Sequence, residues 1–75
     1  MDFKGIGWAI KRMRNGSKVS RQGWNGPGQY LKLFMPGGRS KMTLSYIYIC
    51  TVQGDFVPWL ASQTDLLAED WVVVE

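Results

Sequence analysis

The sequence predicts a small α+β domain, in which a small antiparallel sheet carries an N-terminal amphipathic helix and a short C-terminal helix. Three observations predict this class. Apolar residues near the N-terminus recur at helical spacing, whereas several later segments alternate with the period of a strand. A helix-capping pattern also precedes a short apolar pair near the C-terminus. We further expect the domain to be oligomeric.

The first element is a helix from Asp2 to Asn15. Asp2 can cap its start, and Gly16 is a suitable stop. Basic residues gather near its C-terminal end, where the helix dipole favours cations, and we expect them on a solvated face. Its apolar stripe consists of Phe3, Ile6, Ile10 and Met13.

Five segments after this helix have the character of strands. In the second of them, Leu31, Leu33 and Met35 share one face of the strand. Turn residues separate the segments and predict tight connections. Pro58 indicates that the fourth strand ends there or lies at an edge of the sheet. The expected strands are Lys18–Arg21, Tyr30–Met35, Tyr46–Val52, one that begins at Phe56–Val57, and Trp71–Val74, and the connections are Gly23–Gly28, Pro36–Lys41 and Gln53–Asp55.

The second helix is expected from Gln63 to about Glu69. The run from Ser62 to Asp65 fits a capping box, and it precedes the apolar pair Leu66 and Leu67. Trp71–Val74 then closes the sheet as the last strand.

A chain of 75 residues forms one domain, 1–75, whose own core is marginal. Such a chain usually needs support from disulfides, a metal or oligomerisation. Cys50 is the single cysteine and the chain has no His, so we expect neither a disulfide nor a metal. The four Trp, three Tyr and three Phe favour oligomerisation, because some of these large side chains must lie at interfaces or in pockets.

The N-terminal segment shows no signal peptide, and no segment is apolar enough to span a membrane. We therefore expect a cytosolic protein. The net charge of +3 would attract anions, although ordinary soluble domains often carry as much.

Catalysis is poorly supported, because the absence of His removes the usual general base at neutral pH. Cys50 lies in an apolar strand without a His partner, so we interpret it as a core residue rather than a nucleophile. Asp65, Glu69 and Asp70 cluster in the sequence, and capping and surface charge are their expected roles.

Two segments are candidates for ligand binding. In the first, Trp24 lies in a glycine-rich loop, where it can stack on a nucleobase beside the Asn25 amide or pack back onto the sheet. In the second, Trp59 precedes the second helix, whose first turn offers free amides and polar side chains. This segment can also be a capping box with a structural tryptophan.

The same two segments carry a resemblance to a known family. Gly23-Trp24-Asn25-Gly26, followed by the run from Val57 to Trp71, resembles the Thoeris anti-defence sponge family of the second type, small proteins of phages and prophages. The resemblance covers nearly the whole chain. The connection from Pro36 to Ser45 is shorter here than is typical of that family.

The resemblance implies a homotetramer that captures glycocyclic ADP-ribose, the signal made by the Thoeris TIR protein, and holds it intact so that the effector is never activated. It also implies that some members sequester CBASS cyclic dinucleotides at a separate site. The place of action would be the cytoplasm of the infected bacterial host.

Site roles follow from the resemblance together with the residue types. We expect no cofactor, no membrane contact and no stable nucleic-acid partner. Trp71 is expected in the core or at an interface. The expected ligand-binding residues are Trp24 and Trp59 as stacking or wall residues, Asn25, Ser62, Thr64 and Asp65 as polar contacts, and Arg21 and Arg39 for phosphates.

Three other functions stay open at this point. A small basic nucleic-acid-binding module would show a continuous basic face, whereas the basic residues are scattered along this sequence. A nucleotide-cleaving enzyme is disfavoured because His and metal ligands are missing. A subunit that contacts a host protein through its aromatic residues is the third alternative.

Overall fold

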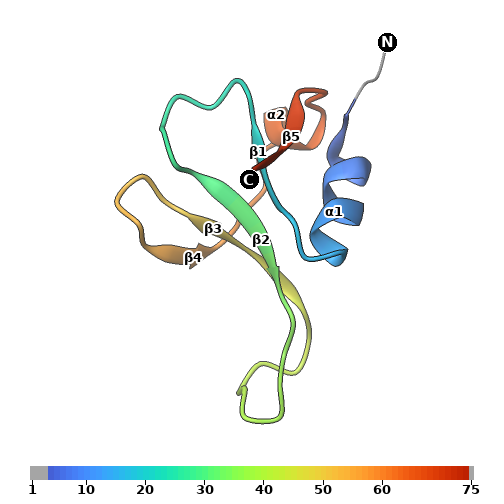
Figure 1. Cartoon of the computed structure of the whole chain (residues 1–75), viewed down its shortest axis with the longest axis vertical. Helices are drawn as coiled ribbons and strands as arrows, with labels where there is room; N and C mark the ends of the chain where they lie inside the picture. Colours follow the sequence, from blue (N-terminus) through green and yellow to red (C-terminus); the bar gives the residue numbers. More distant parts are fainter. Residues whose placement is uncertain (1–3, 75) are drawn as a thin grey trace.

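A five-stranded antiparallel sheet organises the protein, with strands in the order β4-β3-β2-β1-β5. The computed structural model describes residues 4–74. The α+β class is confirmed, with two short helices beside the sheet (Figure 1). The elements are α1 (Ile6–Arg14), β1 (Lys18–Arg21), β2 (Tyr30–Phe34), β3 (Tyr46–Cys50), β4 (Phe56–Pro58), α2 (Gln63–Leu66) and β5 (Trp71–Val74).

Helix α1 begins at Ile6, with Gly5 as its N-cap, so the predicted start at Asp2 is wrong. The carbonyl of Lys4 accepts a hydrogen bond from the amide of Trp71 at 3.1 Å, and Lys4 forms a parallel bridge with Asp70. This pairing holds Lys4 in extended backbone, which a helix cannot continue. Asp2 and Phe3 lie outside the described residues.

The end of α1 agrees with the sequence. Gly16 has a φ of 91°, a conformation that glycine adopts without strain. Its amide donates to the carbonyl of Met13, and the amide of Ser17 donates to that of Arg12. These two bonds form a Schellman motif, which satisfies the last carbonyls of the helix and turns the chain into β1.

The strands keep their predicted positions, and β1 and β5 have the predicted bounds, whereas β2 ends one residue earlier and β3 two residues earlier than predicted. Phe34 pairs with Tyr46 as the last pair of the β2–β3 hairpin, and Met35 lies beyond it. Thr51 leaves β3 to form the turn, in which its carbonyl accepts from the amide of Gly54 at 2.9 Å. Pro58 ends β4, and β4 is an edge strand, so both interpretations of this proline are confirmed.

Helix α2 is a single turn that ends at Leu66, short of the predicted end near Glu69. Ser62 caps it as expected, because its hydroxyl accepts from the amide of Asp65 at 3.1 Å. Asp70 must already be extended to bridge Lys4 and to accept from Gln22 at 3.1 Å. The chain therefore has no room for a second helical turn.

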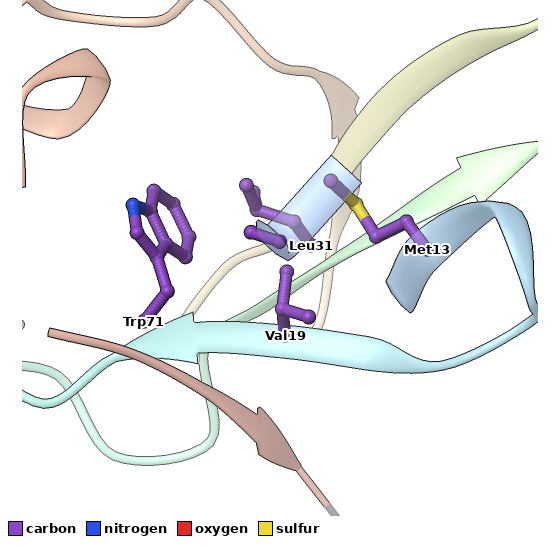
Figure 2. Close-up of a cluster of buried hydrophobic side chains, with 5 residues drawn as sticks. Met13, Val19, Leu31 and Trp71 are labelled. Carbon is purple, nitrogen blue, oxygen red and sulfur yellow. The ribbon is translucent and has the colours of Figure 1, made fainter. Parts of the chain in front are cut away.

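The core lies between α1 and one face of the sheet. Figure 2 shows the side chains of Met13, Val19, Leu31 and Trp71 gathered there. With Ala9, these are the only fully buried hydrophobic residues in the part of the chain that the structure describes. Trp71 is completely buried, which confirms its predicted place in the core. Cys50 is only half-buried and does not belong to this cluster.

Leu31→Ala is expected to lower the free energy of unfolding by about 2–5 kcal/mol, because it removes a fully buried side chain from a small core. Met35→Ala is the matched control, since Met35 is 57% exposed just beyond the same strand and should change stability by less than about 0.5 kcal/mol. Chemical denaturation followed by tryptophan fluorescence measures both. Equal losses in the two variants would contradict the described core.

Candidate functional site

The side chain of Arg21, at the end of β1, lies between two carboxylates. Its Nη1 donates to Asp65 Oδ1 at 2.7 Å, and its Nε donates to Asp70 Oδ1 at 2.8 Å. The amide of Gly23 donates to the second oxygen of Asp70 at 2.8 Å. Arg21 and Asp65 are 16% and 15% exposed, so their ion pair is largely shielded from water, whereas Asp70 is 31% exposed and only partly shielded. The cluster has one positive and two negative charges and leaves a net charge of −1.

The acid–base state of this cluster is set by the pairing. For Asp65, burial alone would raise the pKa, but hydrogen bonds from Arg21 and Trp24 bring it below its ordinary value. For Asp70, the hydrogen bond from Arg21 lowers the pKa despite burial, and the Gly23 amide lowers it further. The two carboxylates raise the pKa of Arg21 in turn. All three groups are therefore charged at neutral pH.

Two tryptophans donate hydrogen bonds to Asp65, and a third packs against one of them. The indole Nε1 of Trp24 donates to the Asp65 carboxylate at 3.2 Å, and that of Trp71 donates to the Asp65 carbonyl at 3.3 Å. The Trp71 ring contacts Trp24 edge-on at 5.5 Å between centroids and Trp59 at 6.1 Å. Trp24 thus packs back onto the core, which was one of the two interpretations of its loop; the other was stacking on a nucleobase. Aromatic pairs in this geometry stabilise the fold beyond simple burial.

An apolar groove of about 470 Å³ opens beside this cluster. It runs between α1, the β2–β3 hairpin and the chain that leads into α2. Half-buried Trp59 forms part of its wall, and Arg14 is the only charged side chain among its described lining residues. Its volume lies in the usual range of small-molecule sites. The lining residues are Ile6, Ile10, Met13, Arg14, Leu33, Ser45, Tyr46, Ile47, Trp59, Ala61 and Leu66.

The structure brings together four of the residues that the sequence singled out. Arg21, Trp24 and Asp65 meet directly, and Trp59 joins them through Trp71. Ser62 caps α2 beside them. The remaining three candidates, Asn25, Thr64 and Arg39, are exposed and do not line the groove, and Arg39 lies in the connection between β2 and β3.

Sequence reasoning missed Asp70 and Arg14. Asp70 was interpreted as surface charge, since nothing local indicates a partner 49 residues away. Arg14 was placed on the solvated face of α1. Its spacing of four residues from Ile10 was an available signal, because residues four apart share one side of a helix and Ile10 lines the groove.

Neither a metal site nor a membrane-spanning helix is found among the described residues. Between residues 4 and 74, no three His, Cys, Asp or Glu side chains converge as a metal site requires. No helix in this range is both long enough and apolar enough to cross a membrane.

Comparison with known proteins agrees with the resemblance inferred from the two tryptophan-bearing segments. A family model described as Thoeris anti-defense 2-like domain matches residues 4–74. The chain is also similar to a protein of Bacillus phage SP01 called Thoeris anti-defense 2, with 32% identity over 82 residues. That alignment covers 92% of this chain and 92% of the phage protein.

Arg21→Ala should reduce the free energy of unfolding by about 2–4 kcal/mol, because it leaves two shielded carboxylates without their partner. The effect should fall below that of a fully buried pair, since both carboxylates keep some contact with water. Arg39→Ala is the control, as Arg39 is exposed and should change stability by less than about 0.5 kcal/mol. Urea denaturation compares the two, and a loss below about 1 kcal/mol for Arg21→Ala would show that the pairing is weak.

The fold should also lose stability in acid. Because the pKa of both Asp65 and Asp70 is lower in the folded state, ionisation stabilises the protein fully above the unfolded aspartate pKa of about 3.9. This contribution disappears as the pH falls through the lower folded-state pKa. Melting temperatures measured from pH 7 to pH 2 should therefore drop below about pH 4, and Asp70→Asn should drop less steeply. Parallel profiles for the two proteins would contradict this origin of the acid sensitivity.

Proposed function

The chain belongs to the Thoeris anti-defense 2-like domain family, and from this premise we propose that it binds and sequesters glycocyclic ADP-ribose without cleaving it. The coarser role, phage anti-defence, comes with the family. The proposed protein is a single sponge domain, 1–75, that acts in the cytoplasm of the infected host and needs no cofactor.

The observation that supports this proposal most directly is the groove of about 470 Å³ with Trp59 in its wall and Arg14 among its lining residues. A nucleotide-like ligand needs an aromatic or apolar surface for its base and a cation for its phosphates. The groove offers both within one lining. We therefore assign the base to the side of Trp59 and the phosphates to Arg14.

Arg21 fits the phosphate role less well than the sequence indicated. Its guanidinium already bonds two carboxylates in a cluster of net negative charge, which repels a phosphate. We assign Arg21 and Asp65 instead to holding Trp24 and Trp71, against which Trp59 packs. In this proposal they shape the wall of the groove.

A second subunit would complete the site. Three of the most exposed leucines each adjoin a lining residue in sequence: Leu44 is 79% exposed, Leu60 is 93% exposed and Leu67 is 78% exposed. Apolar side chains at the rim of an open groove favour burial against another chain. We propose that a homo-oligomer, most simply the tetramer expected for this family, closes the groove in this way.

The exposed candidate residues would contact the ligand from within that assembly. Asn25, Ser62 and Thr64 offer amide and hydroxyl groups near the tryptophan cluster for ribose hydroxyls or base edges. Arg39 lies outside the lining of its own groove, so in this proposal it would reach the ligand from a neighbouring subunit. Capture of CBASS cyclic dinucleotides at a separate site belongs to the same proposal.

The absence of turnover is supported by the state of the carboxylates. General acid–base catalysis works best with groups whose pKa lies near the working pH. Asp65 and Asp70 have lowered pKa values and are already engaged by Arg21, Trp24 and Gly23. The chain contains no His to replace them. A protein of this kind is suited to hold a nucleotide rather than to break it.

Calorimetric titration with glycocyclic ADP-ribose tests the site. Arg14→Ala should weaken binding about tenfold to a hundredfold, because a charge-assisted hydrogen bond contributes about 1.5–3 kcal/mol. Arg12→Ala is the matched control from the same exposed turn of α1, and it should bind like the parent because Arg12 does not line the groove.

Heating the complex and analysing the released ligand by mass spectrometry completes the test. Intact ligand is expected at every incubation time. Linear ADP-ribose that accumulates with time would show an enzyme, and equal binding by the two arginine variants would remove Arg14 from the site.

A further inference from the structure

The side of the sheet that faces away from α1 forms a second surface, here called the outer face. Val19 and Leu31 point into the core, so their neighbours along β1 and β2 point the other way. Both described helices lie on the core side, because α1 covers the buried cluster and α2 bonds Trp71 (Figure 1). The outer face consists of Lys18, Ser20, Tyr30, Lys32, Phe34, Tyr46, Tyr48, Cys50, Phe56, Pro58, Val72 and Val74.

Aromatic rings cover the β2–β3–β4 half of the outer face. Phe34 and Tyr46 stack at 4.9 Å between centroids and 27° between planes. Tyr48 meets Phe56 edge-on at 5.3 Å, and Phe56 is 64% exposed. A cleft of about 240 Å³ lies among these rings, and Val57 and Pro58 also line it. Flat rings around an open cleft are suited to stacking on planar groups.

Two lysines lie at the centre and the β1 side of the same face. The antiparallel register that aligns Val19 with Leu31 places Lys18 and Lys32 beside each other on neighbouring strands. The Nζ of Lys18 lies 4.8 Å from the centroid of the Tyr30 ring. Among the described residues, every ion pair involves Arg21, and no outer-face residue is acidic. Like charges opposite each other destabilise a sheet, so an anion bound here would relieve that repulsion.

We propose that the outer face binds single-stranded nucleic acid, with phosphates over Lys18 and Lys32 and bases on the rings of Phe34, Tyr48 and Phe56. This goes beyond the proposed function, which uses the groove on the core side of the sheet. Tyr46, at the start of β3, lines both that groove and the outer-face cleft. Open antiparallel sheets with surface aromatics stack two or three bases in known RNA-binding modules, and the outer face presents aromatic rings on three neighbouring strands. With two phosphate contacts the complex is weak and salt-sensitive, which agrees with the expectation of no stable nucleic-acid partner.

A second copy of the chain fits this face less well. Two-fold packing of outer faces would bring two Lys18–Lys32 pairs into one dry interface that has no carboxylate to neutralise them. The face is also small. Five strands of three to five residues cover roughly 350 Å² of sheet per copy, less than half of what each partner buries in a standard interface. Charge and area therefore both favour a flexible polyanion.

Fluorescence anisotropy with a labelled uridine octanucleotide tests the proposal. The parent should bind at low salt, with a slope of log K against log salt near −1.4 for two phosphates on a single strand. Lys32→Gln should bring the slope to about −0.7, and Tyr48→Ala should weaken binding about tenfold. Lys11→Gln, on the exposed side of α1, is the control and should bind like the parent.

Three results would overturn the proposal. One is the absence of binding at low salt, and another is an equal effect of Lys11→Gln and Lys32→Gln. The third is a smaller assembly for Tyr48→Ala in light scattering, which would make the outer face a subunit interface. Titration of each variant with glycocyclic ADP-ribose checks its fold, because the groove lies on the other side of the sheet, and a parent that binds RNA but not that ligand would refute only the proposed function.

Discussion

The ion pairs of Arg21 with Asp65 and Asp70 are the constraint on which the rest of the structure depends. They join β1 to two positions 44 and 49 residues further along the chain. Once Asp70 is held there, its carbonyl accepts from the amide of Gln22, and it lies opposite Lys4 in a bridge. The next residue, Trp71, donates its amide to the carbonyl of Lys4 and enters the core at the start of β5. Once Asp65 is held, Trp24 and Trp71 both donate to it. A cluster of partly shielded charges thus holds Lys4, β5, the Gly23 loop and α2 around a core of very few residues.

The two segments that carry the family resemblance are the segments that build this cluster. Gly23 and Trp24 come from the first, and Trp59, Asp65 and Trp71 come from the second. The resemblance therefore marks the structural centre of the fold, and the groove lies next to it. The residues that line the groove beyond Trp59 are mostly ordinary apolar side chains from α1 and the β2–β3 hairpin. A motif search cannot separate such residues from core residues.

Features of the fold that have a local cause could be predicted from the sequence, whereas features that depend on contacts between distant residues could not. Gly16, Pro58 and Ser62 act on their own neighbours, so the end of α1, the end of β4 and the start of α2 were predictable. The start of α1 depends on Lys4 meeting Asp70, and only the folded chain shows this contact. The capping box predicted at Ser62 is confirmed for the Ser62 hydroxyl, which caps α2. The carboxylate of Asp65 does not complete the box, because it bonds Arg21 and Trp24, which are distant in the sequence.

Ligand binding and fold stability are coupled in a chain this small. The fully buried hydrophobic cluster has five described residues, so we expect the free energy of unfolding of a single chain to be small. Under the proposed function, a ligand at a thousand times its Kd adds about 4 kcal/mol to folding, a large part of what a small domain possesses. Under the same proposal, tight binding of the ground state would also oppose turnover, since catalysis requires the transition state to be bound more tightly than the substrate. Under the proposed function, binding of the ligand in a groove that has Trp59 in its wall would therefore both stabilise the fold and keep the ligand intact.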